Sequence, residues 1–156
     1  MDVKQLLANN RFWSESLRAR DPDFFARLAN QQRPEFLWVG CSDSRVPANE
    51  VVGLMPGELF VHRNVANMVV ATDMSFLSVL QFAVDVLQVK QISVCGHYGC
   101  GGVRAALSHE EYGLLDNWLR ALKALYHLHR KQVTRLTDEQ RADPLCELNV
   151  PRQARD

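Results

Sequence analysis

The sequence has no net charge, no long uncharged hydrophobic run and no low-complexity tract. Its 18 Lys and Arg residues balance 18 Asp and Glu residues, so no electrostatic argument favours nucleic acid or an anionic membrane surface as a partner. The longest uncharged stretch of the apolar middle, Met74–Val84, is far shorter than the roughly 20 residues of a membrane-spanning helix. The first residues lack the basic start and apolar run of a signal peptide. We therefore expect a cytoplasmic protein that binds neither nucleic acid nor membrane.

The size and composition indicate one globular domain. A chain of 156 residues with 47% hydrophobic and 23% charged residues can bury a core without disulfides. It contains only four cysteines, and in a cytoplasmic chain these favour ligands, nucleophiles or core thiols over disulfides. Cys95, within an apolar run, and Cys146, in an apolar helical segment, are predicted to serve packing.

Three short apolar runs, each next to a polar or glycine-containing turn, predict buried strands over Phe36–Gly40, Glu58–His62 and Gln91–Cys95. Between the second and third lies a helical segment, Asp73–Leu87, that is apolar around nearly its whole circumference. Such a helix is buried on more than one side, and we expect it between the sheet and another subunit. Strands that alternate with helices predict a parallel sheet with right-handed crossovers.

Helices are predicted towards both ends of the chain. Residues 2–33 are typical of two helices, the second with Asp21 as its N-cap and Pro22 as its first residue. This arm has little sheet of its own to pack on, so we expect it to lie on a partner subunit. A helical pattern resumes at Val103, and an amphipathic stripe of leucines covers residues 114–128.

The residues that carry chemistry directly follow the first and third strands, as Cys41-x-Asp43 and His97-x-x-Cys100. Ligands bind beyond the carboxyl ends of neighbouring strands in an open parallel sheet, so these four side chains converge if the strands are adjacent. Two thiolates, an imidazole and a carboxylate form a competent tetrahedral zinc set. Either half alone is also typical of an ordinary turn, but the pair predicts a zinc site. The glycines of residues 96–102 lack the Gly-x-Gly-x-x-Gly order of a dinucleotide-binding loop.

At these residues the sequence resembles the β-class carbonic anhydrases. Three ordered segments carry the resemblance, which extends to about Val150: Cys41–Pro47, Pro56–Asn67 and Gly96–Val103. It implies an α/β fold with a Rossmann-like parallel sheet in the order 2-1-3, flanked by helices.

The resemblance also implies how the chain is organised. One domain covers residues 1–156, with an N-terminal helical arm over 1–33, a zinc-binding core over 34–150 and an atypical tail over 151–156. The family normally continues with a fourth strand, which is missing here, so the chain resembles a truncated member. Trp38 and Arg63 match residues of the bacterial subgroup. Pro151 is expected to interrupt the helix that the family forms there.

The activity implied by the resemblance is zinc-dependent, reversible hydration of carbon dioxide to bicarbonate and a proton. A zinc-bound hydroxide attacks carbon dioxide, and one Zn²⁺ per chain is assigned to Cys41, His97 and Cys100. Asp43 is the fourth ligand in a closed state and the partner of Arg45 in an open state, so these two residues gate the metal position.

Four further residues take roles by the same resemblance. Gln32, from a neighbouring subunit, and Gly102 are expected to contact the substrate, and Trp38 and Arg63 match a regulatory bicarbonate site of the bacterial subgroup. The family self-associates as dimers or tetramers. Two alternatives stay open: a zinc-binding but catalytically impaired relative of the same fold, and an enzyme that hydrolyses a sulfur analogue of carbon dioxide.

Overall fold

The computed structural model describes residues 2–30, 32–130 and 138–155. It divides the chain into two compact units, Met1–Arg33 and Pro34–Asp156. The metal-ligating residues predicted above all belong to the second unit.

The first unit contains the helices α1 (Val3–Arg20) and α2 (Phe24–Ala29). The predicted start of the second helix at Asp21 and Pro22 is wrong by two residues. The Asp21 carboxylate is bound by the guanidinium of Arg27, and its backbone N–H closes the end of α1, so the residue terminates the first helix instead of capping the second. None of the α1 side chains is buried within this chain.

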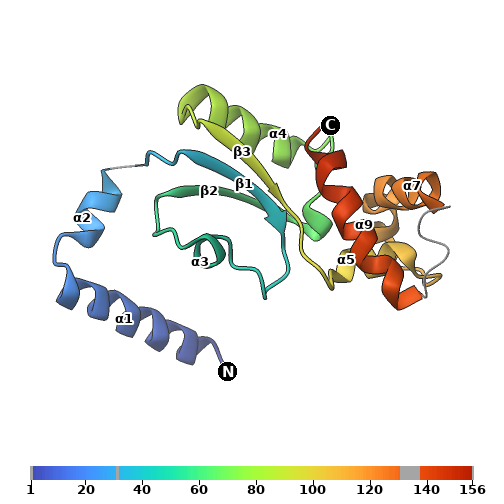
Figure 1. Cartoon of the computed structure of the whole chain (residues 1–156). Coiled ribbons are helices and arrows are strands. Elements are labelled where there is room, and N and C mark those ends of the chain that lie inside the picture. Colours follow the sequence, from blue (N-terminus) through green and yellow to red (C-terminus); the bar gives the residue numbers. More distant parts are fainter. Residues whose placement is uncertain (1, 31, 131–137, 156) are drawn as a thin grey trace. The chain divides into compact units, whose positions relative to one another are not determined.

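The second unit is built on three parallel strands in the order β2-β1-β3, as predicted (Figure 1). They are β1 (Phe36–Cys41), β2 (Leu59–Asn64) and β3 (Gln91–Cys95). Strand β2 extends two residues beyond the prediction because the last residues of β1, Gly40 and Cys41, remain paired with it. The central strand, β1, is buried along almost its whole length.

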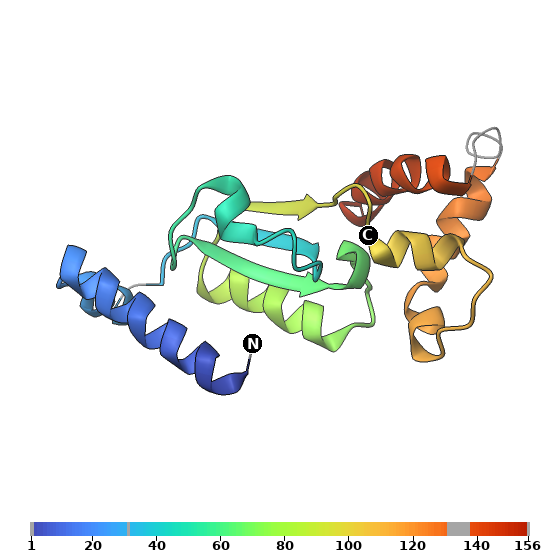
Figure 2. The same cartoon turned by 90° about the horizontal axis from the view of Figure 1, so that it is seen from below.

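One face of the sheet is covered by α4 (Met74–Gln81), which continues as a π-type turn over Phe82–Val86 (Figure 2). The turn closes through the hydrogen bond from Leu87 N to Phe82 O at 3.0 Å. Phe76 and Ala83 pack against the buried residues of β1. The outward side of the helix stays exposed in this chain, so only one of the two expected buried sides is covered.

A second group of helices follows the carboxyl ends of the strands (Figure 1). These are α5 (Gly101–Leu107), α6 (Leu114–Trp118), α7 (Arg120–Leu128) and α9 (Asp138–Gln153), and the short α3 (Ala48–Val52) precedes β2. The predicted stripe over residues 114–128 is thus divided between two helices. Leu119, between them, is fully buried and contributes to the core that these helices share.

Helix α9 continues through Pro151, so the predicted interruption is wrong. A proline removes one backbone donor, and here tertiary hydrogen bonds on both sides of it hold the helix in place. Asn149 Nδ2 donates to Ala66 O at 2.9 Å, and Gln153 Nε2 donates to Asn149 Oδ1 at 2.8 Å. Gln153 Oε1 in turn accepts a hydrogen bond from Val69 N at 2.6 Å. These bonds connect α9 to the segment that follows β2.

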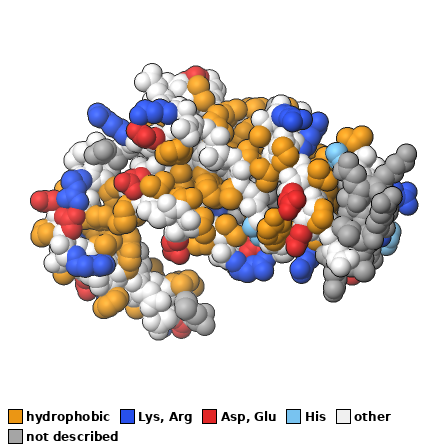
Figure 3. Space-filling view, in the orientation of Figure 1, with side chains coloured by type: hydrophobic (Ala, Val, Ile, Leu, Met, Phe, Trp, Pro, Cys, Tyr) orange, Lys and Arg blue, Asp and Glu red, His pale blue; other side chains and the backbone are white. Residues whose placement is uncertain are grey.

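None of the described helices combines the length and apolarity needed to span a bilayer. On the face shown in Figure 3, the acidic and basic side chains of the second unit are interspersed among hydrophobic ones. This distribution agrees with the zero net charge of the sequence.

We expect Asn149→Ala to lower the free energy of unfolding by about 1–3 kcal/mol, because Ala66 O and Gln153 then lose a partner in a buried environment. Urea unfolding followed by circular dichroism measures this change. Asn117→Ala is the matched control, since Asn117 is exposed and its side chain accepts a hydrogen bond from Arg120 at the surface. Equal destabilisation by the two variants would contradict the structural role of Asn149.

Candidate metal centre

Two loops leave the sheet at the same edge. One follows Cys41 at the end of β1, and the other follows Cys95 at the end of β3 and leads into α5. The two strands are adjacent and parallel, with Gly40 of β1 opposite Cys95 of β3. The pairing of the strands therefore brings the two segments Cys41-x-Asp43 and His97-x-x-Cys100 to the same edge, as predicted.

The side chains of Cys41, His97 and Cys100 come together at this point. One ligand atom from each lies within 4.8 Å of the others, and the two sulfur atoms are 3.8 Å apart. Both cysteines are buried. His97 Nδ1 donates to Tyr98 O at 3.0 Å, which leaves the Nε2 lone pair free for a metal. Nε2 is buried and has no hydrogen-bond partner in the described part of the chain.

This arrangement fits zinc. Two sulfurs that are each about 2.3 Å from a tetrahedrally coordinated Zn²⁺ lie about 3.8 Å from each other, which matches the separation of Cys41 Sγ and Cys100 Sγ. The unpaired His97 Nε2 supplies a third ligand. The site is thus a Cys-His-Cys metal centre.

The two thiols are electrostatically unequal. The hydrogen bond from the Cys100 thiol lowers the pKa of Cys41, and the nearby His97 side chain and the backbone of Asp43 and Ala66 lower it further against the opposing effect of burial. The same sulfur–sulfur hydrogen bond, with burial, raises the pKa of Cys100. One thiol of the pair therefore ionises readily, whereas the second needs a neighbouring cation to release its proton.

Asp43 lies beside the ligands and is held by Arg45. The guanidinium donates from Nε to Asp43 Oδ1 at 2.8 Å and from Nη2 to Oδ2 at 2.6 Å, and the Arg45 backbone N–H adds a third bond at 3.0 Å. These bonds lower the pKa of Asp43 well below its usual range. Asp43 Oδ2 is 3.8 Å from His97 Nε2, so the carboxylate stands at the edge of the ligand set.

Arg45 also contacts the second loop. Its Nη2 donates to Gly99 O at 3.1 Å, so one side chain joins the loop of Asp43 to the loop of His97 and Cys100. From the other direction, Tyr98 donates its hydroxyl proton to Glu147 of α9 at 2.7 Å. The second loop is therefore held between Arg45 and α9.

Gly102 lies where the first turn of α5 meets the segment after β2. A Cβ atom at this position would lie 2.7 Å from Val65 Cγ1, which is closer than real Cβ contacts allow, and 3.0 Å from the Ala66 Cβ, which is unusually tight. Ala66 and Asn67 have positive φ angles of 66° and 46°, so this segment is strained. The polar side chains of α9 that hold it were not identified from the sequence, although Asn149 and Gln153 have helical i, i+4 spacing.

The remaining predicted residues differ in their surroundings. Trp38 is buried, and its indole occupies the space over Gly40, where a Cβ would be 2.3 Å from Trp38 Nε1. Arg63 donates to the carbonyl oxygens of Cys41 and Asp43. Gln32 is exposed and belongs to the first unit. His62 is buried edge-on against Phe76 and makes a hydrogen bond with Asn64, so it serves packing.

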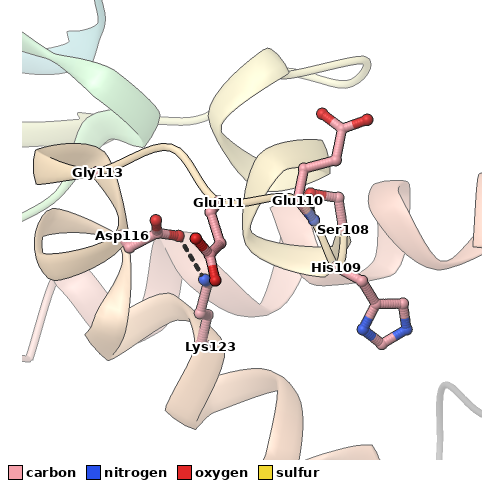
Figure 4. A pocket seen from close by; sticks show the side chains of 7 residues that line it. All are labelled: Ser108, His109, Glu110, Glu111, Gly113, Asp116 and Lys123. Carbon is pink, nitrogen blue, oxygen red and sulfur yellow. Dashed lines mark hydrogen bonds and ion pairs between the residues drawn. The ribbon is translucent and has the colours of Figure 1, made fainter.

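A separate hollow of about 510 Å³ lies over the loop between α5 and α6 (Figure 4). Within it Lys123 is paired with Asp116 at 2.8 Å, which lowers the pKa of Asp116. His109 is exposed at its rim. None of the predicted site residues lines this hollow.

Comparison with known proteins supports the assignment that the metal centre suggests. The sequence profile of the family described as "Carbonic anhydrase" matches residues 36–156. The chain belongs to the β-class carbonic anhydrases. It is 51% identical over 147 residues to a carbonic anhydrase of Emericella nidulans, and 42% identical over 156 aligned residues to one of Candida albicans.

These matches cover 94% and 95% of this chain but 64% and 54% of the two relatives, so the chain spans between about half and two thirds of their length. A crystal structure described as one of two tetrameric β-carbonic anhydrases from Sordaria macrospora superimposes with a TM-score of 0.94. It is 42% identical and covers 97% of this chain and 78% of that one. All three relatives are fungal, so the bacterial subgroup predicted from the sequence is not confirmed.

We expect Cys100→Ala to abolish tight zinc binding, because it removes one of two buried thiolates from the ligand set. Metal analysis after zinc loading and gel filtration should find one zinc per parent chain and almost none in the variant. Cys95→Ala is the control, since it removes a thiol from the same strand-end region that is not among the ligands. A full zinc content in the Cys100 variant would exclude this residue as a ligand.

Proposed function

We propose that this chain is a zinc enzyme that hydrates carbon dioxide reversibly to bicarbonate and a proton, with one Zn²⁺ per chain. The observation that supports this most strongly is the composition of the ligand set. Three side chains, from Cys41, His97 and Cys100, gather around one point, and the carboxylate of Asp43 is held beside them by Arg45. Catalytic zinc sites keep three protein ligands and an open fourth position, whereas structural zinc sites are closed by four.

Zinc bound here supplies the chemistry of a coordinated water whose pKa is about 7, and hence a nucleophile near neutral pH. The protein residues control access to the fourth position. While Arg45 holds Asp43, the carboxylate would leave the fourth position to water, and a carboxylate released from Arg45 would be free to take it. Arg45 keeps the pKa of Asp43 low, so the carboxylate is ionised at neutral pH and the exchange would need no change in its protonation.

Carbon dioxide needs an apolar space next to the nucleophile. We place Gly102 at that space, since its missing side chain brings the apolar groups of Val65 and Ala66 close to the start of α5. Gln32 is proposed to contact the substrate from a neighbouring subunit. Self-association as a dimer or tetramer is proposed as well, in line with the tetrameric Sordaria macrospora relative.

A regulatory site and the cellular location stay predictions. Trp38 and Arg63 are the predicted contacts of a regulatory bicarbonate, and their basis in the bacterial subgroup is weakened by the fungal relatives. The cytoplasmic location is also a prediction.

The function is tested by stopped-flow measurement of carbon dioxide hydration with a pH indicator. Zinc-loaded protein should accelerate hydration, and the metal-free protein and Cys100→Ala should not. A full zinc content without acceleration would favour the catalytically impaired relative of the same fold. Hydrolysis of carbonyl sulfide or carbon disulfide without turnover of carbon dioxide would favour the enzyme for a sulfur analogue.

We expect Arg45→Ala to lower kcat/KM for hydration by about tenfold or more near neutral pH, since residues that orient groups at a metal site typically contribute 10–100-fold. The Asp43 carboxylate loses its partner and becomes free to occupy the fourth position. The deficit should shrink at alkaline pH, where hydroxide competes better with the carboxylate.

The control for this prediction is Arg27→Ala. Arg27 also binds an aspartate, Asp21, through two hydrogen bonds, in the first unit and on an exposed surface. Its removal should leave the pH–rate profile unchanged. A profile of Arg45→Ala that matches the parent at every pH would contradict the gating role.

A further inference from the structure

The side chain of Arg63 reaches from β2 to the loop that follows β1. Its Nε donates to Cys41 O at 2.8 Å, and its Nη2 donates to Asp43 O at 2.5 Å. Between these two contacts, the backbone N–H of Ser42 donates to Asn64 O at 2.8 Å. The last residue of β1 and the first two residues of the loop are thus fixed to β2 one after another.

The end of the β1–β2 ladder explains why these contacts matter. The last paired residues are Cys41 and Asn64, and beyond them the chain turns away from the sheet. The carbonyl groups of Cys41 and Asp43 therefore need donors from outside the ladder. A guanidinium provides two N–H groups in one rigid plane, and hydrogen bonds from a charged donor are roughly twice as strong as neutral ones.

The register of the β1–β2 ladder places Arg63 where its side chain can reach the carbonyl groups of Cys41 and Asp43. Arg63 is the partner of Gly40 in the ladder, one residue before Cys41. Its side chain lies on the same face of the sheet as that of Trp38, because paired residues of neighbouring strands point to the same side. The absence of a side chain at Gly40 leaves the Trp38 indole room to lie over the strand there.

We propose that Arg63 is a positioning residue of the metal centre. By fixing the carbonyls of Cys41 and Asp43, it sets the backbone from which the Cys41 sulfur and the Asp43 carboxylate project. Arg45 acts on the Asp43 side chain and on Gly99 O, whereas Arg63 acts on the main chain of the first loop alone. This inference rests on the proposed zinc-dependent function.

The positioning role differs in one measurable respect from a contact with regulatory bicarbonate. Nε and Nη2, the edge with which a guanidinium grips an anion in two bonds, are the atoms that hold Cys41 O and Asp43 O. A positioning residue acts whether or not bicarbonate is present. An anion contact acts only when the anion is bound.

The experiment is a zinc-affinity measurement by chelator competition in buffer freed of carbon dioxide and bicarbonate. Arg63→Ala should weaken zinc binding by about 10–100-fold, the usual effect of removing a group that orients metal ligands. Arg63→Lys should fall between Arg63→Ala and the parent, because an ammonium group replaces the planar fork and can serve one carbonyl well. Cobalt-substituted Arg63→Ala should show a changed visible absorption spectrum.

The control is Arg120→Ala, which removes an exposed arginine of α7 that donates to Asn117. Its zinc affinity and cobalt spectrum should equal those of the parent. Circular dichroism establishes which variants are folded, and Arg63→Lys decides the question alone if Arg63→Ala does not fold.

The proposal would be overturned if folded Arg63→Ala bound zinc as tightly as the parent. If Arg63→Ala does not fold, a parent-like zinc affinity of Arg63→Lys would overturn it. A loss of affinity confined to bicarbonate-containing buffer would also overturn it and support the anion contact. If the parent itself bound no zinc, the proposed function would fail. If the parent bound zinc and hydrated carbon dioxide while the Arg63 variants matched it, only the positioning role would fail.

Discussion

The pairing of β1 with a parallel strand on each side is the constraint on which the rest of the structure depends. Cys41 is opposite Asn64 of β2, and Gly40 is opposite Cys95 of β3, so all three strands end at one edge. A shift of one residue in the ladder between β1 and β3 would turn every side chain of the shifted strand to the other face and separate the two halves of the metal centre. Burial of β1 on both faces gives this register its stability.

The helices beyond the strand ends supply the remaining support. The left-handed backbone at Ala66 and Asn67 is unfavourable for residues with a Cβ, and such strain persists only where the surroundings enforce it. Here α9 provides the bonds, since Asn149 donates to Ala66 O and Gln153 accepts from Val69 N. The same helix holds the second loop through Glu147. A helix distant in sequence from both half-motifs therefore helps to shape them.

Much of this could be predicted from the sequence, because the strands carry continuous apolar patterns and the three ligands directly follow two of them. The course of α9 past Pro151 could not, since a local rule about proline was overruled by tertiary hydrogen bonds of Asn149 and Gln153. The contacts of Arg63 could not be predicted either, because they go to backbone carbonyl groups. Every residue carries such a group, so the sequence does not indicate which ones accept the hydrogen bonds. The bacterial subgroup is not confirmed for a related reason: it was inferred from two side chains, Trp38 and Arg63, without their surroundings, and the relatives compared are fungal.

The position of Arg45 between the two loops has a mechanical consequence. Its guanidinium holds the Asp43 carboxylate of one loop and the Gly99 carbonyl of the other. In the gating that we propose, departure of the carboxylate would deprive the guanidinium of its hydrogen bonds to Asp43 and leave the contact with Gly99 O as its link to the second loop. The loop that carries His97 and Cys100 would then be tied less firmly to the loop of Asp43. Arg45 would thus couple the exchange at the fourth coordination position to the second loop through protein contacts alone.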